Sequence, residues 1–223
     1  MLLDLDDTLV DQQGAADAAV VAWAAEHGIH DAGVSQRWAA VSAVHYGRYQ
    51  RRELSFADQR RARVRELLSL EVDDADADDL FTGYLRRYEA GWVLFDDARP
   101  ALRRARSAGL VVAVLTNGDE EQQRRKLHLL GLEDEVDVLV AASSLPAGKP
   151  DVRAFRGALA RIGAHAEEAL MIGDSLEEDV RGALRAGLDA VLVDRGGDGR
   201  ARDVRTVASL DEVTFGTPPV GGR

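Results

Sequence analysis

The sequence of 223 residues lacks cysteine altogether and contains almost no lysine. The absence of cysteine excludes disulfides, thiol nucleophiles and zinc sites built from thiolates. Only Lys126 and Lys149 are lysines among the 28 lysine and arginine residues. Because a compact ammonium and a planar guanidinium are not interchangeable at a tight phosphate site, Lys149 is a candidate for such a site. A GC-rich coding bias or chance would produce the same scarcity.

Long apolar runs are also missing. Runs such as Leu110–Leu115 are far shorter than the ~20 residues that span a bilayer. The first residues carry no basic segment and turn acidic at Asp4, unlike a secretory signal peptide, so we expect a cytoplasmic protein with no membrane partner. The net charge of −11 argues against nucleic acid or an anionic membrane as a partner, and solubility alone accounts for it.

The length and the 46% hydrophobic content suffice for one sizeable core, with or without a small accessory domain. The apolar spacing of residues 12–91 is typical of helices rather than strands. We predict helices over Gly14–His27, Val34–Tyr49, Ser55–Ser69 and Leu80–Gly91. Ser55 and Asp58 form a capping-box pattern, and the acidic run Asp73–Asp79 precedes the last helix, where it favours the helix dipole.

Residues 92–223 follow a different pattern, in which short apolar strands alternate with helices. We predict strands over Leu110–Leu115, Val136–Ala141, Ala169–Ile172 and Ala190–Val193. We predict helices over Pro100–Ala108, Glu120–Leu130, Val152–Ile162 and Glu177–Ala186, and a frayed tail over 216–223. Such alternation indicates a parallel sheet that is buried on both faces, with its site beyond the carboxyl ends of the strands.

The first ten residues contain the most closely spaced group of candidate reactive side chains. Met1-Leu2-Leu3 reads as a strand that leads into Asp4-Leu5-Asp6-Asp7-Thr8. The alternation of side chains along a strand places Asp4 and Asp6 on one side, where two carboxylates repel each other. A chain keeps such a pair when a cation or a reaction needs it, although turns are also rich in aspartate.

Three later strands also lead into reactive polar segments. These are Thr116–Gly118, Gly148–Pro150 and Gly173–Asp179. A hydroxyl and backbone N–H groups at a turn can hold a phosphoryl oxygen, and an ammonium can balance its charge. Taken singly, each segment has a simpler explanation: an ordinary turn, a solvated lysine or a helix N-cap.

Taken together, the four segments read D-x-D-x-T, T-N-G, G-K-P and G-D-S-x-x-x-D, and they resemble in order the four motifs of the haloacid dehalogenase-like (HAD) hydrolases. The helical insertion resembles the cap of the subgroup that contains phosphoglycolate phosphatase, β-phosphoglucomutase, haloacid dehalogenase and several nucleotide phosphatases. The resemblance implies an α/β fold, a Rossmann-like parallel sheet core with an inserted all-helical cap domain. The core would comprise 1–11 and 92–223, and the cap 12–91.

The resemblance also implies residue roles. Asp4 would be the nucleophile that forms an aspartyl-phosphate, and Asp6 would protonate the leaving alkoxide and later activate water. The implied phosphate-binding residues, in part through backbone N–H groups, are Leu5, Asp6, Thr116, Asn117 and Lys149. The implied metal ligands are Asp4, Asp6 through its backbone carbonyl, Asp174 and Asp179. Hard oxygen ligands of this kind suit Mg²⁺ better than Zn²⁺.

The presence of Asp6 favours phosphoryl transfer, because dehalogenases of the family need neither Mg²⁺ nor this residue. We therefore expect a Mg²⁺-dependent phosphatase acting on a small phosphorylated metabolite. The alternatives are a phosphomutase of the same family, a non-catalytic phosphate-sensing protein and a receiver-type signalling domain. The sequence identifies neither the phosphomonoester nor the choice between monomer and homodimer.

Each of three further features has a simple explanation and a functional one. The basic stretch Arg48–Arg52 is expected to be a solvated helix face rather than a contact for an acidic substrate. Trp23, Trp38 and Trp92 are expected in the core rather than as substrate platforms. Family members have a longer strand before the nucleophile than Met1–Leu3, so we expect the natural reading frame to begin upstream or the sequence to have been trimmed.

Overall fold

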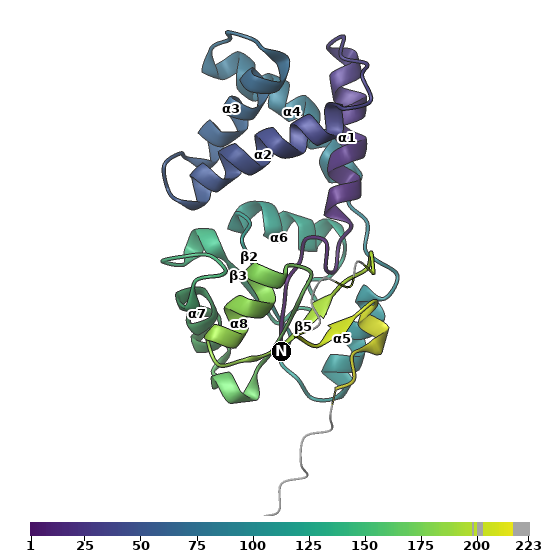
Figure 1. The fold of residues 1–223 in the computed structure, drawn as a ribbon, viewed down its shortest axis with the longest axis vertical. Coiled ribbons are helices and arrows are strands. Elements are labelled where there is room, and N and C mark those ends of the chain that lie inside the picture. The colour runs from purple at the N-terminus through teal and green to yellow at the C-terminus, as the bar shows by residue number, and fades with distance from the viewer. Residues whose placement is uncertain (198, 200–202, 216–223) are drawn as a thin grey trace, which may run out of the picture. The chain divides into compact units, whose positions relative to one another are not determined.

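The computed structural model describes residues 1–197, 199 and 203–215. The chain separates into two compact units (Figure 1). The helical unit comprises Gln12–Val93, and the core unit comprises Met1–Asp11 with the described residues from Leu94 onward. The tail over 216–223, for which the sequence predicts fraying, lies outside the described residues. The role of the helical unit as a cap stays a prediction.

The helical unit consists of four α-helices in sequence order. They are α1 (Gln12–Glu26), α2 (Val34–Gln50), α3 (Phe56–Leu68) and α4 (Asp74–Ala90). The predicted cap of α3 is confirmed, since the Ser55 hydroxyl accepts a hydrogen bond from the Asp58 N–H at 3.0 Å. The predicted start of α4 at Leu80 is wrong. The Asp73 carboxylate accepts from the Asp76 N–H at 2.9 Å and caps the helix one and a half turns earlier, so the acidic run forms its first turns.

Aromatic side chains fill the centre of the helical unit. The ring of Trp38 lies 5.7 Å from that of Trp23 and 4.7 Å from that of Tyr84, measured between centroids. Trp92 lies 5.2 Å from Tyr88 in an edge-to-face arrangement. All three tryptophans are buried, which confirms their expected place in the core. Pairs of this kind add to the burial of their large apolar area.

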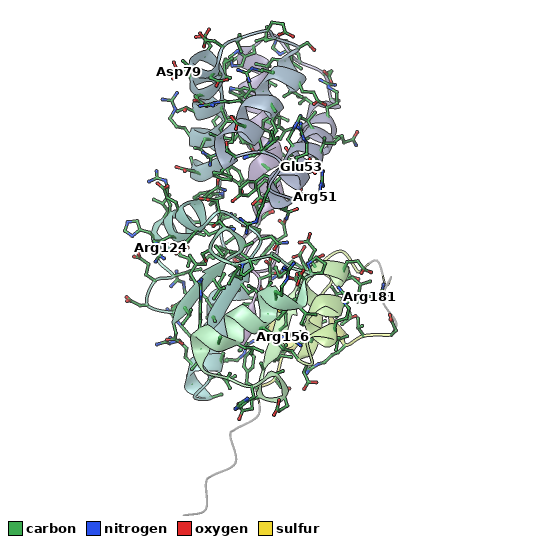
Figure 2. The ribbon with its side chains drawn as sticks, turned by 90° about the vertical axis from the view of Figure 1, so that its left-hand side faces the viewer. Arg51, Glu53, Asp79, Arg124, Arg156 and Arg181 are labelled. Carbon is green, nitrogen blue, oxygen red and sulfur yellow. The ribbon has the colours of Figure 1, made fainter. Side chains whose placement is uncertain are left out.

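The basic stretch at the end of α2 lies at the surface of the helical unit. Figure 2 shows Arg51 beside Glu53, and the guanidinium Nε lies 2.7 Å from the Glu53 carboxylate. Both side chains are exposed, and Arg48 also pairs with Glu53 at 3.5 Å. This arrangement agrees with the expected solvated face.

The core unit is built on a six-stranded sheet in which every strand pairs in parallel, and it confirms the predicted α/β fold. The strand order is β3-β2-β1-β4-β5-β6. The strands are β1 (Leu2–Leu3), β2 (Ala113–Thr116), β3 (Val138–Ala141), β4 (Leu170–Gly173), β5 (Asp189–Val193) and β6 (Thr206–Val207). The sequence analysis did not predict β6, whose two residues are too few for a periodic signal.

The short strand β1 lies at the centre of the sheet. Leu2 pairs with Ala113 of β2 on one side and with Met171 of β4 on the other. Helices α5 (Ala98–Ser107), α6 (Glu120–Leu129), α7 (Val152–Ile162) and α8 (Gly182–Arg185) surround the sheet (Figure 1). Leu2 and Phe155 of α7 are fully buried in one apolar cluster. The crowded environment of β1 fixes the direction in which the following residues leave the sheet.

The largest differences between the predicted core unit and the structure concern one strand and one helix. Strand β2 begins at Ala113 rather than Leu110, because the Val112 N–H donates to the Asp137 side chain at 2.8 Å instead of to a neighbouring strand. The helix predicted over Glu177–Ala186 consists of a π-helical turn, Leu176–Arg181, followed by the short α8. In that turn the Val180 N–H donates to the Ser175 carbonyl, five residues back, at 3.2 Å.

None of the described helices combines the length and the apolar character that crossing a membrane requires.

Candidate active site

The chain turns sharply just after β1 and brings Asp4 and Thr8 to the carboxyl end of the sheet. The Asp4 N–H continues the pairing with β4 by donating to the Ile172 carbonyl at 2.9 Å. Asp7 adopts a left-handed backbone conformation, with φ of 61°, and its N–H donates to the Val10 carbonyl at 2.7 Å. The turn places the Thr8 hydroxyl 3.2 Å from Asp174, so the first and the last motif meet.

Lys149 joins the nucleophile candidate to the last motif. Its ammonium lies 2.5 Å from Asp4 Oδ1 and 2.5 Å from Asp179 Oδ1, and all three side chains are buried. The Asn117 side chain fixes the backbone of Lys149, accepting from its N–H at 2.7 Å and donating to its carbonyl at 2.9 Å. Gly148 is needed for this approach, since a Cβ there would lie 2.6 Å from Asn117 Oδ1. Asn117 therefore positions Lys149.

Asp4, Asp174 and Asp179 form a group of carboxylates whose ligand atoms all lie within 4.8 Å of one another. Asp179 reaches this group from the π-helical turn, and its Oδ2 accepts from the Ser175 N–H at 3.0 Å. Gly173 leaves the necessary room, because a Cβ there would overlap the Asp179 carboxylate. Three hard oxygen donors at this spacing fit Mg²⁺, which binds a few carboxylates and completes its shell with water or phosphate.

The charges in this group are not balanced by the protein. Burial raises the pKa of Asp4 well above its usual range; the Lys149 ammonium opposes this rise, and Asp179 and Asp174 add to it. Burial also raises the pKa of Asp174 to about 6, with a contribution from Asp179. Burial would lower the pKa of Lys149, but the charges of Asp179 and Asp4 outweigh burial and raise it. One ammonium does not balance three carboxylates, so the site favours an added cation.

Three hydrogen-bond donors near Asp4 have no acceptor among the described residues. The Thr116 hydroxyl oxygen accepts from the Gly118 N–H at 3.0 Å and from Gln123 Nε2 at 2.9 Å. Both lone pairs are thus used, and the hydroxyl hydrogen has no acceptor in the part of the chain that the structure describes. The same holds, among the described residues, for the backbone N–H groups of Leu5 and Asp6. These groups can donate to an anion.

The Asp6 carboxylate stands outside the group of three and has partners of its own. Its Oδ1 forms an ion pair with the Lys126 ammonium, and its Oδ2 accepts from Gln123 Nε2 at 2.7 Å. The structure thus brings together all the site residues that the sequence predicts, but it divides their side chains between two clusters. The assignment of the Asp6 carbonyl to the metal stays a prediction.

The sequence analysis missed Lys126 and Gln123. The predicted site residues all come after strands, whereas these two lie three residues apart on α6 and share its buried face. A signal was present in the composition, since the two lysines of the chain are the two cations that pair with Asp6 and Asp4. A buried lysine needs an acidic partner, and the first motif contains such acids in Asp4 and Asp6.

Comparison with known proteins identifies similar sequences and folds. The family model described as haloacid dehalogenase-like hydrolase matches residues 1–187. The phosphoserine phosphatase of Thermus thermophilus is 45% identical over 111 residues, which are 50% of this chain and 43% of that protein. The chain spans about half the length of the curated relatives that it matches.

Two solved structures cover nearly the whole chain. The structure of the HAD-hydrolase YfnB from Bacillus subtilis, described as bound to magnesium, has a TM-score of 0.81 at 24% identity. It covers 95% of this chain and 94% of its own, and at this identity it shows the fold alone. The HAD phosphatase from Thermococcus onnurineus has a TM-score of 0.67 at 26% identity, with 95% of this chain and 94% of its own chain covered.

Proposed function

The chain belongs to the haloacid dehalogenase-like hydrolases, and from this membership and its site we propose that it is a Mg²⁺-dependent phosphatase that hydrolyses a small phosphomonoester through an aspartyl-phosphate on Asp4. The observation that carries the proposal is the place of Asp4, which contacts Lys149 and shares a group of carboxylates with Asp174 and Asp179. A nucleophile beside a cation-binding group is the arrangement that attack on a phosphate dianion requires.

When bound by Asp4, Asp174 and Asp179, Mg²⁺ would neutralise phosphoryl charge and reduce the repulsion among the carboxylates. The hydrogen-bond donors described above would hold the phosphoryl oxygens. These are the Thr116 hydroxyl and the N–H groups of Leu5 and Asp6, with the Lys149 ammonium beside them. Because these donors are already in place, they need no reorganisation when charge develops in the transition state.

The reaction then follows from the two carboxylates of the first motif. An oxygen of Asp4 forms a bond to phosphorus as the bond between phosphorus and the ester oxygen breaks. Asp6 donates its proton to the departing alkoxide, which leaves as the alcohol. In the second step Asp6 removes a proton from water, whose oxygen attacks phosphorus, and the Asp4–phosphate bond breaks to release phosphate and the free carboxylate.

The named relatives support hydrolysis of a phosphoester. They include the phosphoserine phosphatase of Thermus thermophilus and a glyceraldehyde 3-phosphate phosphatase of Methanothermobacter thermautotrophicus, 34% identical over 99 residues. The presence of Asp6 argues against a dehalogenase, which has no leaving alkoxide to protonate. Lys149, Asp4 and the acidic group argue against a phosphate sensor, which has no use for a nucleophile. No observation favours the phosphomutase alternative.

The test is phosphate release from a panel of phosphomonoesters, with and without Mg²⁺. The panel would contain phosphoserine, sugar phosphates, nucleotides, phosphoglycolate and p-nitrophenyl phosphate. We expect Mg²⁺-dependent release that Asp4→Asn abolishes. The matched control is Asp211→Asn, the same substitution at an exposed carboxylate that pairs with Arg104, and it should keep full activity. Release that survives Asp4→Asn would overturn the proposal.

A further inference from the structure

We propose that Lys126 and Gln123 act as a positioning pair, which holds the Asp6 carboxylate in place for proton transfer to the leaving group. The inference rests on the proposed phosphatase function and extends it to two residues of α6 that lie outside the four motifs. Neither residue would touch the phosphorus or the nucleophile. Lys126 would act through Asp6, and Gln123 through Asp6 and the Thr116 hydroxyl that it also contacts.

The first observation is the burial of Lys126. Its side chain is entirely buried, and its ammonium forms an ion pair with Asp6 Oδ1. Burying a lysine is costly, and a partner acid must compensate for the lost hydration. In a chain that uses arginine at nearly every basic position, both lysines meet a carboxylate of the first motif, Lys149 at Asp4 and Lys126 at Asp6. The use of lysine rather than arginine in both pairs points to a function that needs a compact cation at Asp6.

The second observation is the position of Gln123, three residues before Lys126 on the same helix face. Its amide nitrogen donates both to Asp6 Oδ2 at 2.7 Å and to the Thr116 hydroxyl at 2.9 Å. Gln123 thus links the proton-transfer carboxylate to the hydroxyl that would hold a phosphoryl oxygen. Gly118 permits this link, because a Cβ there would lie 2.7 Å from Gln123 Cγ and closer still to its amide nitrogen.

The two contacts together restrain the Asp6 side chain. Each carboxylate oxygen has one protein donor, so rotation of the carboxylate would break at least one contact. Each oxygen keeps a second lone-pair site, and 26% of the side chain remains exposed, so the group stays open to a leaving alkoxide. Restraint of this kind matters because a displacement of about 1 Å can cost ~10²-fold in rate.

Leaving groups of different acidity separate a positioning role from a merely structural one. 2,4-Dinitrophenolate leaves without a proton, whereas phenolate and alkoxides leave slowly unless an acid protonates them. A pair that only stabilises the fold would affect every ester equally. A pair that positions the acid would affect the poor leaving groups alone. The ratio kcat/KM is the correct readout, because it covers the steps up to departure of the leaving group.

The experiment measures kcat/KM for 2,4-dinitrophenyl phosphate, p-nitrophenyl phosphate and phenyl phosphate in the full chain with Mg²⁺. For Lys126→Met we expect a loss of ~10²-fold on phenyl phosphate and of at most ~3-fold on 2,4-dinitrophenyl phosphate. Asp6→Asn should show the same selectivity. Addition of Lys126→Met to Asp6→Asn should cause little further loss on phenyl phosphate, since the two residues act on one step.

Two substitutions on the same helix serve as controls. Arg124→Met removes an exposed cation from α6 (Figure 2) that pairs with Glu120 at 2.8 Å. It should leave the whole series unchanged. Leu127→Ala removes a buried side chain beside Lys126 and should lower the melting temperature, but it should leave the ratio between the two esters as in the wild type. If Lys126→Met does not fold, Gln123→Leu tests the inference through the ratio between the two esters, because the lost contact with Thr116 would lower the rate on every ester alike.

The possible results are distinguishable. Selective loss on phenyl phosphate in the folded variants supports the inference. An equal loss on every ester, or the same selectivity in Leu127→Ala, overturns it and leaves the proposed function intact. Failure of the wild type to hydrolyse these aryl esters and every phosphomonoester of the panel above overturns the proposed function, and the inference falls with it.

Discussion

Lys149 Nζ lies 2.5 Å from Asp4 Oδ1, although 145 residues separate the two in sequence. A single ammonium therefore contacts the proposed nucleophile directly, inside a site that water barely reaches. The ammonium favours the charged, nucleophilic form of Asp4 and opposes the rise in its pKa that burial causes.

The first prediction concerns the size of that cation. Lys149→Met should lower kcat/KM for p-nitrophenyl phosphate by at least ~10²-fold, because it removes stabilisation of the developing charge. Lys149→Arg should not restore activity, since a planar guanidinium does not fit between two carboxylates that each lie 2.5 Å from the present nitrogen. Steady-state kinetics on both variants would check this, with circular dichroism as the control for folding. Wild-type activity in Lys149→Arg would contradict it.

The second prediction concerns the metal ligands. Asp174→Asn should raise the Mg²⁺ concentration for half-maximal activity by at least ~10-fold, because an amide replaces one of three charged ligands. Removal of divalent cations with EDTA should abolish the activity of the wild type, and Mg²⁺ should restore it. A Mg²⁺ titration of the activity measures both effects. An unchanged Mg²⁺ requirement in Asp174→Asn would exclude this residue as a ligand.

The third prediction concerns Gly173, which gives Asp179 its room. Gly173→Ala should displace the Asp179 carboxylate and lower kcat/KM by ~10-fold or more, because ligand displacement weakens metal affinity. Gly47→Ala is the matched control, since Gly47 lies within α2 and a Cβ there meets only the flexible Arg51 side chain at 3.3 Å. The control should keep its activity and gain ~0.5–1 kcal/mol in the free energy of unfolding. Full activity in Gly173→Ala would show that Asp179 does not need its present position.

The fourth prediction concerns the pH dependence of stability through Asp97. Burial tends to raise the pKa of this carboxyl, but hydrogen bonds from Arg195, Ser209 and the Leu210 N–H lower it below its ordinary value of 3.8. A carboxyl with a lowered pKa in the folded state stabilises the fold above its unfolded pKa. This contribution is lost as the pH falls through the folded value.

Asp97→Asn should therefore reduce the free energy of unfolding by ~1–3 kcal/mol at pH 7, since buried donors lose their charged partner. The difference from the wild type should shrink as the pH falls below 3.8. Urea unfolding between pH 2.5 and 7 would measure it. The exposed Asp211→Asn variant should show a small difference throughout. A constant difference for Asp97→Asn over the whole range would refute the prediction.

The place of Asp4 could be read from the sequence because parallel strands end at a common edge of the sheet. Four polar segments that come after strands therefore lie along that edge, and the order of the strands decides which of them meet. The strand order is a tertiary outcome. The sequence predicts that Met1–Leu3 is a strand, and its resemblance to the family implies a central position, which the pairing of Leu2 with both Ala113 and Met171 confirms.

The errors of the sequence analysis arise where a side chain competes with the regular backbone pattern. Asp73 caps α4 ahead of its apolar residues, and Asp137 takes the Val112 N–H that would have extended β2. Lys126 was not predicted as a site residue because a helical lysine is normally solvated. Its burial depends on Asp6, which lies 120 residues away in sequence. No local pattern encodes that pairing.

The central position of β1 also constrains how the chain folds. Leu2 and Leu3 find their strand partners about 110 and 170 positions later in the sequence, whereas the four helices of Gln12–Val93 pack among themselves. Contacts that close long loops form slowly, because the chain loses the entropy of the loop before the contacts can stabilise it. We expect the helices to become ordered before the sheet closes around β1. The nucleophile would then be assembled late in folding, so incompletely folded molecules would carry no competent site.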